Sequence, residues 1–290
     1  MRTVLKRAYE YLATYGLLAI LAVMILAWTV LALVLLSPLP KRWRRATARY
    51  TMMAGFRLFS RMLTAAGAYE LDLEAIDTLR GGPPLVLAPN HPTSIDAILF
   101  LTRHPDLACI LKPELMGNFF LGAGARLAGF IRSDPPRRMV REAVAELGRG
   151  GLVLLFPEGT RSTRAPLNRL TGSAGVIARQ ARAPIQLAII ETDSPYLSKG
   201  WPIFKVPRLP IRYRVRLGRR LEPAADASAE TITLAIEREL TRELASAPQN
   251  GWLGGGGSGP CHSPSVAAEP PARASVRGRS PERGYVKCPR

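Results

Sequence analysis

The sequence predicts an α/β fold: a mixed, largely parallel sheet flanked by helices, preceded by an N-terminal membrane helix. Three observations carry this prediction. Short apolar runs bounded by Gly and Pro alternate with segments of helical periodicity, as in βαβ units. Two of these runs end in polar segments, at residues 89–96 and 157–162. An apolar stretch at residues 17–36 is long enough to cross a bilayer.

The membrane helix comes first in the chain. Residues 17–36 form a nearly unbroken apolar run, in which Thr29 is the only polar side chain. About 20 helical residues span about 30 Å, the hydrocarbon thickness of a bilayer. Pro38 and Pro40 end the helix, and a basic cluster follows at residues 41–45. Residues 1–45 are therefore predicted to be a transmembrane anchor, whose basic flank places the following domain on the cytoplasmic side of the inner membrane.

A second, amphipathic helix is predicted at residues 46–66. Its apolar side chains recur at helical spacing: Met52, Phe56, Phe59 and Leu63. Arg57 and Arg61 fall away from that stripe. Such a helix lies at the membrane interface or packs its apolar face on the domain, and the pattern fits both. A monotopic arrangement of the two helices, without a full span, also stays open.

Alternating strands and helices follow, and residues 46–247 are predicted to form one domain. Strands are expected at residues 71–73, 85–88, 107–111, 129–131, 152–156, 185–190 and 211–217. Helices are expected at residues 96–101, 114–128, 136–148, 172–181 and 226–244. The strand 211–217 alternates apolar residues with arginine, as at a sheet edge or in an antiparallel strand. Residues 248–290, rich in Gly, Pro, Ser and Arg, are predicted to be a disordered basic tail.

The net charge and the cysteine content indicate which classes of partner to expect. The chain of 290 residues has 40 Lys and Arg against 22 Asp and Glu, a formal net charge of +18. This balance suits anionic partners such as phospholipid surfaces, coenzyme A, an acidic carrier protein or nucleic acid. Because the basic residues lie mostly beside apolar segments and no nucleic-acid motif is found, a membrane is expected and nucleic acid is not. The 3 Cys have no metal-like spacing, which fits a reducing compartment and no metal site.

The strand at residues 85–88 leads into the first chemically informative corner. Pro89 and Pro92 stop the strand, and Ser94 is the expected N-cap of the next helix. His91 then lies at the strand end and Asp96 in the first helical turn. A carboxylate on one imidazole nitrogen fixes the tautomer and leaves the other nitrogen to accept a hydroxyl proton. On these two residues alone, the simpler hypothesis, two unrelated caps, is favoured.

A second motif reverses that preference. The strand at residues 152–156 ends in Pro-Glu-Gly-Thr-Arg-Ser, residues 157–162. Here the sequence resembles the glycerolipid acyltransferases of the lysophosphatidic acid acyltransferase type. Asn90, His91 and Asp96 match their Asn-His-x4-Asp motif, and residues 156–162 match their Phe-Pro-Glu-Gly-Thr-Arg-Ser motif in full. The resemblance covers roughly residues 50 to 220 and implies the glycerolipid acyltransferase fold.

The resemblance implies a reaction. A fatty acyl group passes from acyl-CoA or acyl carrier protein to the free hydroxyl of a lysophospholipid, first of all 1-acyl-sn-glycerol 3-phosphate, which becomes phosphatidic acid. His91 is expected to deprotonate the hydroxyl and Asp96 to orient His91. No Ser or Cys is placed as a nucleophile, so no covalent intermediate is expected. No cofactor beyond the acyl donor is implied, and the oligomeric state is left open.

Glu158, Gly159, Thr160 and Arg161 lie in the match to the Phe-Pro-Glu-Gly-Thr-Arg-Ser motif, which is the third motif of the family. In the family these positions bind the acceptor's glycerol phosphate, and the resemblance implies that role here. Gly159 allows close backbone approach and Arg161 offers a planar fork of donors. Glu158 repels a phosphate, so it is expected to orient Arg161 or a neighbouring hydroxyl.

The family's second motif has a weaker counterpart. Lys112 resembles its start and Arg132 the basic residue that closes it. Both follow predicted strands, and an arginine there could hold a phosphate. Equally, Arg132 fits a surface residue paired with Asp134.

Two departures concern the acceptor. Leu170 stands where the family usually has a lysine, and the segment 183–187 keeps only the first of two usual prolines, Pro184. The alternatives are therefore the same chemistry on another acceptor, such as lyso-ornithine lipid or glycerol 3-phosphate, or a non-catalytic membrane lipid-binding protein. The intact pair of His91 and Asp96 argues against the last.

Overall fold

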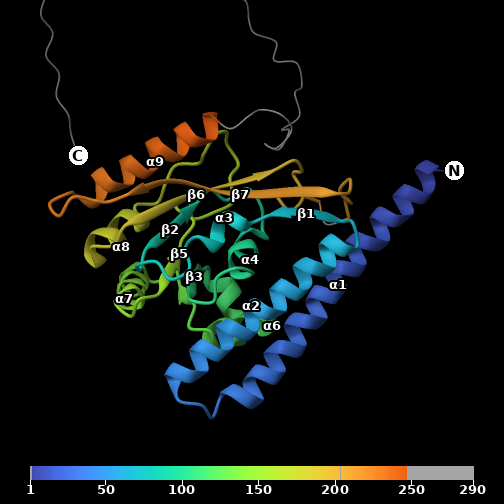
Figure 1. Cartoon of the computed structure of the whole chain (residues 1–290), viewed down its shortest axis with the longest axis horizontal. Helices are drawn as coiled ribbons and strands as arrows, with labels where there is room; N and C mark the ends of the chain where they lie inside the picture. The colour runs from blue at the N-terminus through green and yellow to red at the C-terminus, as the bar shows by residue number, and fades with distance from the viewer. Residues whose placement is uncertain (1, 203, 247–290) are drawn as a thin grey trace, which may run out of the picture. The chain divides into compact units, whose positions relative to one another are not determined.

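The computed structural model describes residues 2–202 and 204–246, so the predicted tail at 248–290 lies outside the described residues. In this part of the chain a seven-stranded sheet has the order β1-β7-β6-β2-β5-β3-β4 (Figure 1). Its strands are β1 Tyr69–Asp72, β2 Val86–Pro89, β3 Leu107–Leu111, β4 Ile131–Arg132, β5 Leu152–Leu154, β6 Ile185–Thr192 and β7 Ile211–Leu221. From β6 to β4 all neighbours are parallel. The predicted mixed, largely parallel sheet is confirmed.

The strand β7 is the antiparallel member. It runs antiparallel to β6 and pairs in parallel with β1. Ile211, Tyr213 and Val215 are buried, while the arginines between them are exposed, which explains the alternation seen in the sequence. The prediction of an antiparallel strand is confirmed, but β7 is not at the sheet edge because β1 covers its other side.

The helices largely follow the predicted pattern. They are α1 Arg2–Leu36, α2 Lys41–Ala65, α3 Glu74–Asp77, α4 Asp96–Leu101, α5 Pro113–Gly117, α6 Phe119–Leu127, α7 Pro136–Leu147, α8 Ser173–Ala181 and α9 Ala229–Ser246. The single helix expected at 114–128 is wrong. Its backbone becomes extended at Asn118, whose Oδ1 accepts the N–H of Leu121 at 3.1 Å and so caps α6. The short α3 was not predicted.

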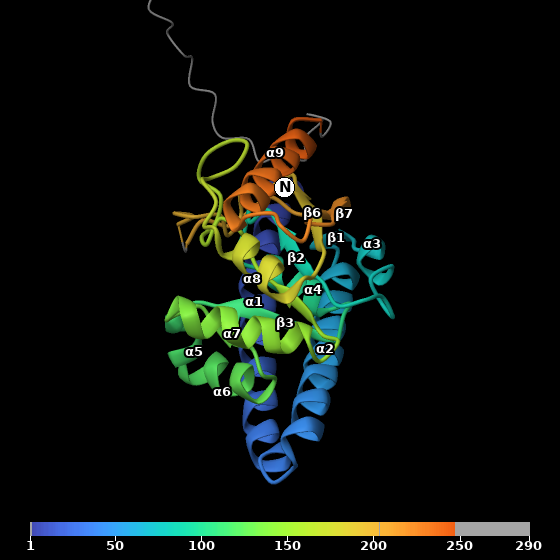
Figure 2. The same cartoon turned by 90° about the vertical axis from the view of Figure 1, so that its left-hand side faces the viewer.

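Helices cover both faces of the sheet. On one face α7, α8 and α9 pack against one apolar cluster, and α1, α2 and α4 pack against the other (Figure 2). Successive residues of β2 point to opposite faces: Val86 and Ala88 join the first cluster and Leu87 the second. A strand buried on both faces has no polar side, which is why its sequence is a continuous apolar run.

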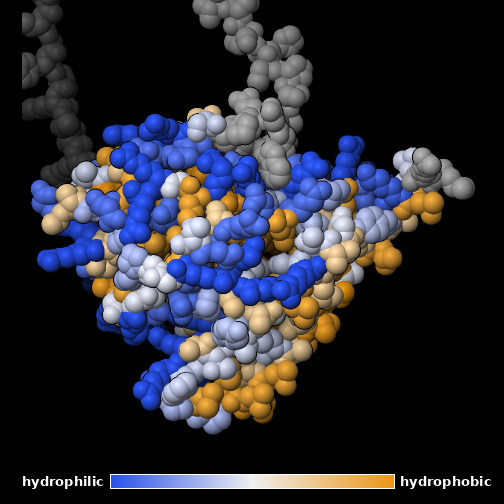
Figure 3. Space-filling model, in the orientation of Figure 1, coloured by the Kyte–Doolittle hydropathy of each residue, from blue (hydrophilic) through white to orange (hydrophobic). Residues whose placement is uncertain are grey.

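The first two helices form an antiparallel hairpin that turns at residues 37–40 (Figure 1). The helix α1 begins at Arg2, well before the apolar run, and residues 3–36 are long and apolar enough to cross a membrane. The basic segment 41–45 forms the first turn of α2 rather than a separate flank. Hydrophobic surface gathers along α1 (Figure 3).

Contacts with the rest of the domain run along α1. Near its start, the buried Glu10 accepts the N–H of Leu209 through Oε1 at 3.4 Å. Near its end, Trp28 donates through Nε1 to Thr51 Oγ1 at 3.1 Å, and a Cβ on Gly124 of α6 would come within 2.3 Å of the Trp28 ring. Glycine at 124 therefore permits the close approach of α6 to α1.

Candidate active site

The corner after β2 is held by Asn90. Its Nδ2 donates to Ile190 O at 3.1 Å and its Oδ1 accepts the Ile190 N–H at 2.7 Å, which ties the end of β2 to β6. His91 follows, and Asp96 opens α4 as predicted. The N-cap prediction for Ser94 is wrong. Ile95 occupies that position, and the Ser94 hydroxyl instead donates to Leu197 O at 3.3 Å.

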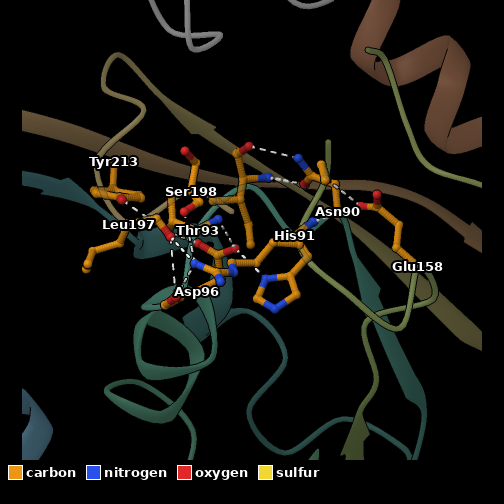
Figure 4. Close-up of polar contacts among 12 residues, drawn as sticks. Asn90, His91, Thr93, Asp96, Glu158, Leu197, Ser198 and Tyr213 are labelled. Atoms are coloured by element: carbon orange, nitrogen blue, oxygen red, sulfur yellow. Dashed lines mark hydrogen bonds and ion pairs between the residues drawn. The ribbon is translucent and has the colours of Figure 1, made fainter. Parts of the chain in front are cut away.

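His91 and Asp96 are hydrogen-bonded (Figure 4). The distance from His91 Nδ1 to Asp96 Oδ2 is 2.7 Å, with Asp96 fully buried and the His91 side chain 18% exposed. Asp96 Oδ2 also accepts the Thr93 N–H at 2.8 Å, and the Thr93 hydroxyl donates to Oδ1. Because a carboxylate engages Nδ1, the proton of the neutral ring lies on Nδ1 and the Nε2 lone pair is available.

The surroundings of the pair fix its chemistry. Burial raises the pKa of Asp96, and hydrogen bonds from His91 and Thr93 oppose part of that rise. A carboxylate with a raised pKa is a stronger hydrogen-bond acceptor for the imidazole. The His91 ring also stacks on Phe156, with ring centroids 3.9 Å apart and planes at 20°. The imidazole is thus oriented through its edge and its face.

The loop after β5 is tied to the His91 corner by Glu158. This buried carboxylate accepts the His91 N–H at 3.1 Å and the Ser162 hydroxyl at 2.6 Å through Oε1, and the Asn168 N–H at 3.0 Å through Oε2. Ser162 N–H in turn donates to His91 O at 2.7 Å. Of the two partners expected for Glu158, the structure shows the neighbouring hydroxyl and not Arg161.

Arg161 is anchored by one nitrogen. Its Nη1 lies within hydrogen-bond distance of Ser94 Oγ at 2.9 Å, Leu197 O at 2.8 Å and Ser198 O at 3.0 Å. Its Nε and Nη2 bond to none of the described residues. The guanidinium therefore has one corner held by the protein and one edge available to a ligand.

The backbone beside Arg161 requires glycine. Gly159 has a φ of +66°, in the left-handed region, and a Cβ there would lie 2.9 Å from Thr171 Cγ2. Gly159 is exposed and Thr160 is half-buried. An exposed glycine lets a ligand approach the backbone closely at this strand end.

Lys112 and Arg132 lie at the same edge of the sheet. The neighbouring strands β2, β5, β3 and β4 are parallel, so their carboxyl ends meet at one edge, where α/β sheets bind ligands. Lys112 follows β3 and is exposed. Arg132 ends β4, is 48% exposed and lies 4.0 Å from Asp134, so the surface pairing foreseen for it is present. Within the described residues, neither side chain hydrogen-bonds to His91 or Asp96.

Leu170, and Gln186 in the segment 183–187 that keeps only one proline, have structural roles. Leu170 is half-buried and packs against the apolar cluster that α8 joins. Gln186 donates through Nε2 to Gly218 O at 2.7 Å, across the irregular register between β6 and β7. Neither residue therefore supplies a cation to the acceptor side.

Thr93, Tyr213 and the segment 194–198 complete the site and were missed from sequence. Tyr213 donates its hydroxyl to Thr93 Oγ1 at 3.1 Å, a contact across 120 residues. Tyr213 was foreseen only as a buried position of an alternating strand. The segment carries the carbonyls that hold Arg161 and no motif.

Two small apolar cavities, of about 40 and 70 Å³, are lined in part by α1 and α2, and the first also by β1 and α4. They share Leu21 and Phe59 in their walls, and the first also reaches Ile95 and Leu197, the neighbours of Asp96 and Ser198. Apolar surface thus extends from the helical hairpin to the corner that holds His91 and Asp96. Among residues 2–202 and 204–246, no cluster of three His, Cys, Asp or Glu side chains could hold a metal ion.

Part of the chain is similar in sequence to known acyltransferases. Residues 70–191 match the family model described as Acyltransferase. The chain is 29% identical over 133 residues to 1-acyl-sn-glycerol-3-phosphate acyltransferase alpha of Mus musculus, over 43% of this chain and 46% of that protein. The chain therefore matches about half the length of this curated relative.

A solved structure shares the fold. The crystal structure of the 1-acyl-sn-glycerophosphate (LPA) acyltransferase PlsC from Thermotoga maritima superposes with a TM-score of 0.63 at 20% identity. The match covers 83% of this chain and 96% of that one. The family model thus matches the segment that carries both sequence motifs, and the chain shares the fold of this acyltransferase structure.

Proposed function

We propose that this protein transfers a fatty acyl group from acyl-CoA or acyl carrier protein to the free hydroxyl of 1-acyl-sn-glycerol 3-phosphate, forming phosphatidic acid. The observation that carries the proposal is the 2.7 Å contact between His91 Nδ1 and the buried Asp96. It leaves Nε2 available as a base, on a side chain that is 18% exposed. The names of the Mus musculus and Thermotoga maritima relatives support this acceptor.

The chemistry is direct acyl transfer. His91 Nε2 takes the acceptor's hydroxyl proton while the oxygen attacks the thioester carbonyl, and Asp96 stabilises the imidazolium. The new C–O bond forms, the C–S bond breaks, and the leaving thiolate recovers the proton from Nε2. No acyl-enzyme is needed. Cys109 is unsuited to form one, because it is fully buried and burial raises the pKa of its thiol to about 12.

Arg161 is proposed to hold the acceptor's phosphate. Its Nη1 is already fixed by carbonyls of Leu197 and Ser198, so its free edge points in one direction without further ordering. Gly159 and Thr160 offer backbone and hydroxyl contacts beside it. Lys112 and Arg132 add positive charge at the same sheet edge, which suits the phosphates of either acyl donor or acceptor.

The hairpin of α1 and α2 is proposed to hold the protein on the inner membrane, with the catalytic domain in the cytoplasm. Because α1 contacts the domain both at Glu10 and at Trp28, a perpendicular span would draw α6 and the segment near Leu209 into hydrocarbon. These contacts support a monotopic arrangement, in which the exposed apolar side of α1 enters one leaflet. The basic turn at 41–45 would then meet anionic headgroups.

One assay tests the acceptor. The protein purified in detergent is given radiolabelled acyl-CoA with lysophosphatidic acid, glycerol 3-phosphate, lysophosphatidylglycerol or lyso-ornithine lipid. Lysophosphatidic acid should be acylated fastest. A preference for lyso-ornithine lipid, which lacks phosphate, would overturn the role of Arg161. Absence of transfer to every acceptor, from acyl-CoA and from acyl carrier protein, would favour a lipid-binding protein without turnover.

A variant tests the phosphate contact itself. Arg161→Lys keeps the charge but loses the planar fork, so it should raise the KM for the acceptor more than the KM for acyl-CoA. Arg164→Lys is the matched control, because Arg164 is exposed in the same loop and pairs with none of the described residues. Equal effects of the two substitutions would contradict the proposal.

A further inference from the structure

We propose that Tyr213 of β7 is a positioning residue for the catalytic pair and acts on Asp96 through Thr93. This inference rests on the proposed function of His91 and Asp96. The hydroxyl of Tyr213 lies 3.1 Å from Thr93 Oγ1, and the Thr93 hydroxyl in turn donates to Asp96 Oδ1 (Figure 4). A chain of hydrogen bonds therefore runs from the sheet to the carboxylate that orients His91.

The direction of each bond follows from the groups. An ionised carboxylate only accepts, so the Thr93 proton points to Asp96 and a lone pair of Thr93 Oγ1 faces Tyr213. Tyr213 must then be the donor. Burial raises the pKa of Tyr213, which keeps that proton in place. With its two further bonds from His91 and the Thr93 N–H, the Asp96 carboxylate has donors on both oxygens.

The chain is closed to solvent. Tyr213 and Asp96 are each 0% exposed and Thr93 is 1% exposed, so water does not replace a lost donor without rearrangement. Buried hydroxyls without partners are costly, and removal of one donor leaves the next group unsatisfied. Loss of the Tyr213 hydroxyl would therefore be felt at Thr93 and then at Asp96.

Tyr213 is the rigid end of this chain. Its backbone pairs with Thr192 of β6 on one side and Leu71 of β1 on the other. Its ring stacks on Tyr69, with centroids 6.1 Å apart and planes at 14°. Thr93 and Asp96, by contrast, lie on a loop and at the start of the six-residue α4. Because the pairing of β7 with two neighbouring strands holds Tyr213 in place, its hydroxyl can fix the positions of Thr93 and Asp96.

The test measures kcat and KM of the full-length protein in detergent. Tyr213→Phe removes only the hydroxyl and should lower kcat by about three- to tenfold, the value of one neutral hydrogen bond, with both KM values unchanged. Thr93→Val should lower kcat at least as much, and Thr93→Ser should restore most of the loss. In the double variant, Tyr213→Phe should add nothing to Thr93→Val, since both break one chain.

A control separates positioning from stability. Val215→Ala shortens a buried side chain on the same face of β7 and keeps the hydroxyls of Tyr213 and Thr93, so it should lower the unfolding temperature but leave kcat unchanged. Wild-type kcat for Tyr213→Phe, or additive effects in the double variant, would overturn the inference while His91→Ala remained inactive. Should Tyr213→Phe fail to fold, wild-type kcat for Thr93→Val would overturn it. If His91→Ala were fully active, the proposed function itself would fail.

Discussion

Glu146 of α7 is the residue whose removal should cost the most stability for the smallest change in shape. Its buried carboxylate accepts from Arg49 Nη1 at 2.6 Å and Arg149 Nη1 at 3.2 Å, and lies 3.5 Å from Arg45 Nη1. Arg49, in α2, is 9% exposed and also donates to Ala128 O at 2.7 Å. The Glu146–Arg49 pair thus joins the helical hairpin to α7 and, through Arg49, to the turn before β4.

The substitution Glu146→Gln keeps the shape and removes the charge. It leaves Arg49 buried beside two other arginines with no anion, and breaking a buried pair in this way costs about 3–5 kcal/mol. The exposed pair of Arg138 and Glu142, one turn away on α7, is the control. Its side chains are 58% and 34% exposed, so Glu142→Gln should cost less than about 1 kcal/mol.

Thermal unfolding of both variants in the same detergent gives the measurement. For a domain of this size the cost predicted for Glu146→Gln corresponds to a fall of about 6–20 °C in Tm, against a few degrees at most for Glu142→Gln. Equal shifts would refute the view that the buried pair links α2 to the domain. A stable Glu146→Gln protein would show that Arg49 finds solvent or another partner.

Three further predictions concern a carboxyl, a thiol and a helix contact. Burial raises the pKa of Asp96, so the protonated carboxyl contributes stability that is complete below the ordinary carboxyl pKa of about 4 and is lost as pH rises through the raised pKa. The Tm of Asp96→Asn should therefore increase relative to that of the wild type as pH rises. A difference that stays constant with pH would contradict this. With Cys261 and Cys288 replaced by Ser, Cys109 should react with a thiol reagent only on unfolding, since it is fully buried; rapid native labelling would refute its burial. Gly175→Ala should cost about 1–3 kcal/mol, because its Cβ would lie 2.3 Å from Ala229 O, whereas Gly55→Ala meets no atom within 4 Å and should be neutral or stabilising by denaturant unfolding; the reverse order would be inconsistent with the α8–α9 contact.

Much of the sheet could be predicted because its central strands are buried on both faces. The runs at β2, β3 and β6 are apolar apart from Gln186, whose amide is satisfied within the sheet, and Glu191 and Thr192 at the end of β6. The break between α5 and α6 could not, because it depends on one residue, Asn118, in a segment that otherwise has helical periodicity. The length of α1 was underestimated because the charged and polar residues before position 17 hid its start.

The site divides in the same way. His91 and Asp96 lie five residues apart, so one local motif foretold their pairing. The partners of Arg161 and Thr93 could not be foretold, because Leu197 and Tyr213 reach them from segments 36 and 120 residues away. Local patterns specify which side chains carry chemistry, while the contacts that orient those side chains arise from the topology of the sheet.

The most direct test of the account is the initial rate of acyl transfer from acyl-CoA to lysophosphatidic acid by His91→Ala. Removal of a positioned general base should lower kcat by about 10²–10⁴-fold, while Tm and membrane association stay near those of the wild type. Transfer at the wild-type rate would contradict the assignment of His91 as the base and, with it, the mechanism built on the His91–Asp96 contact.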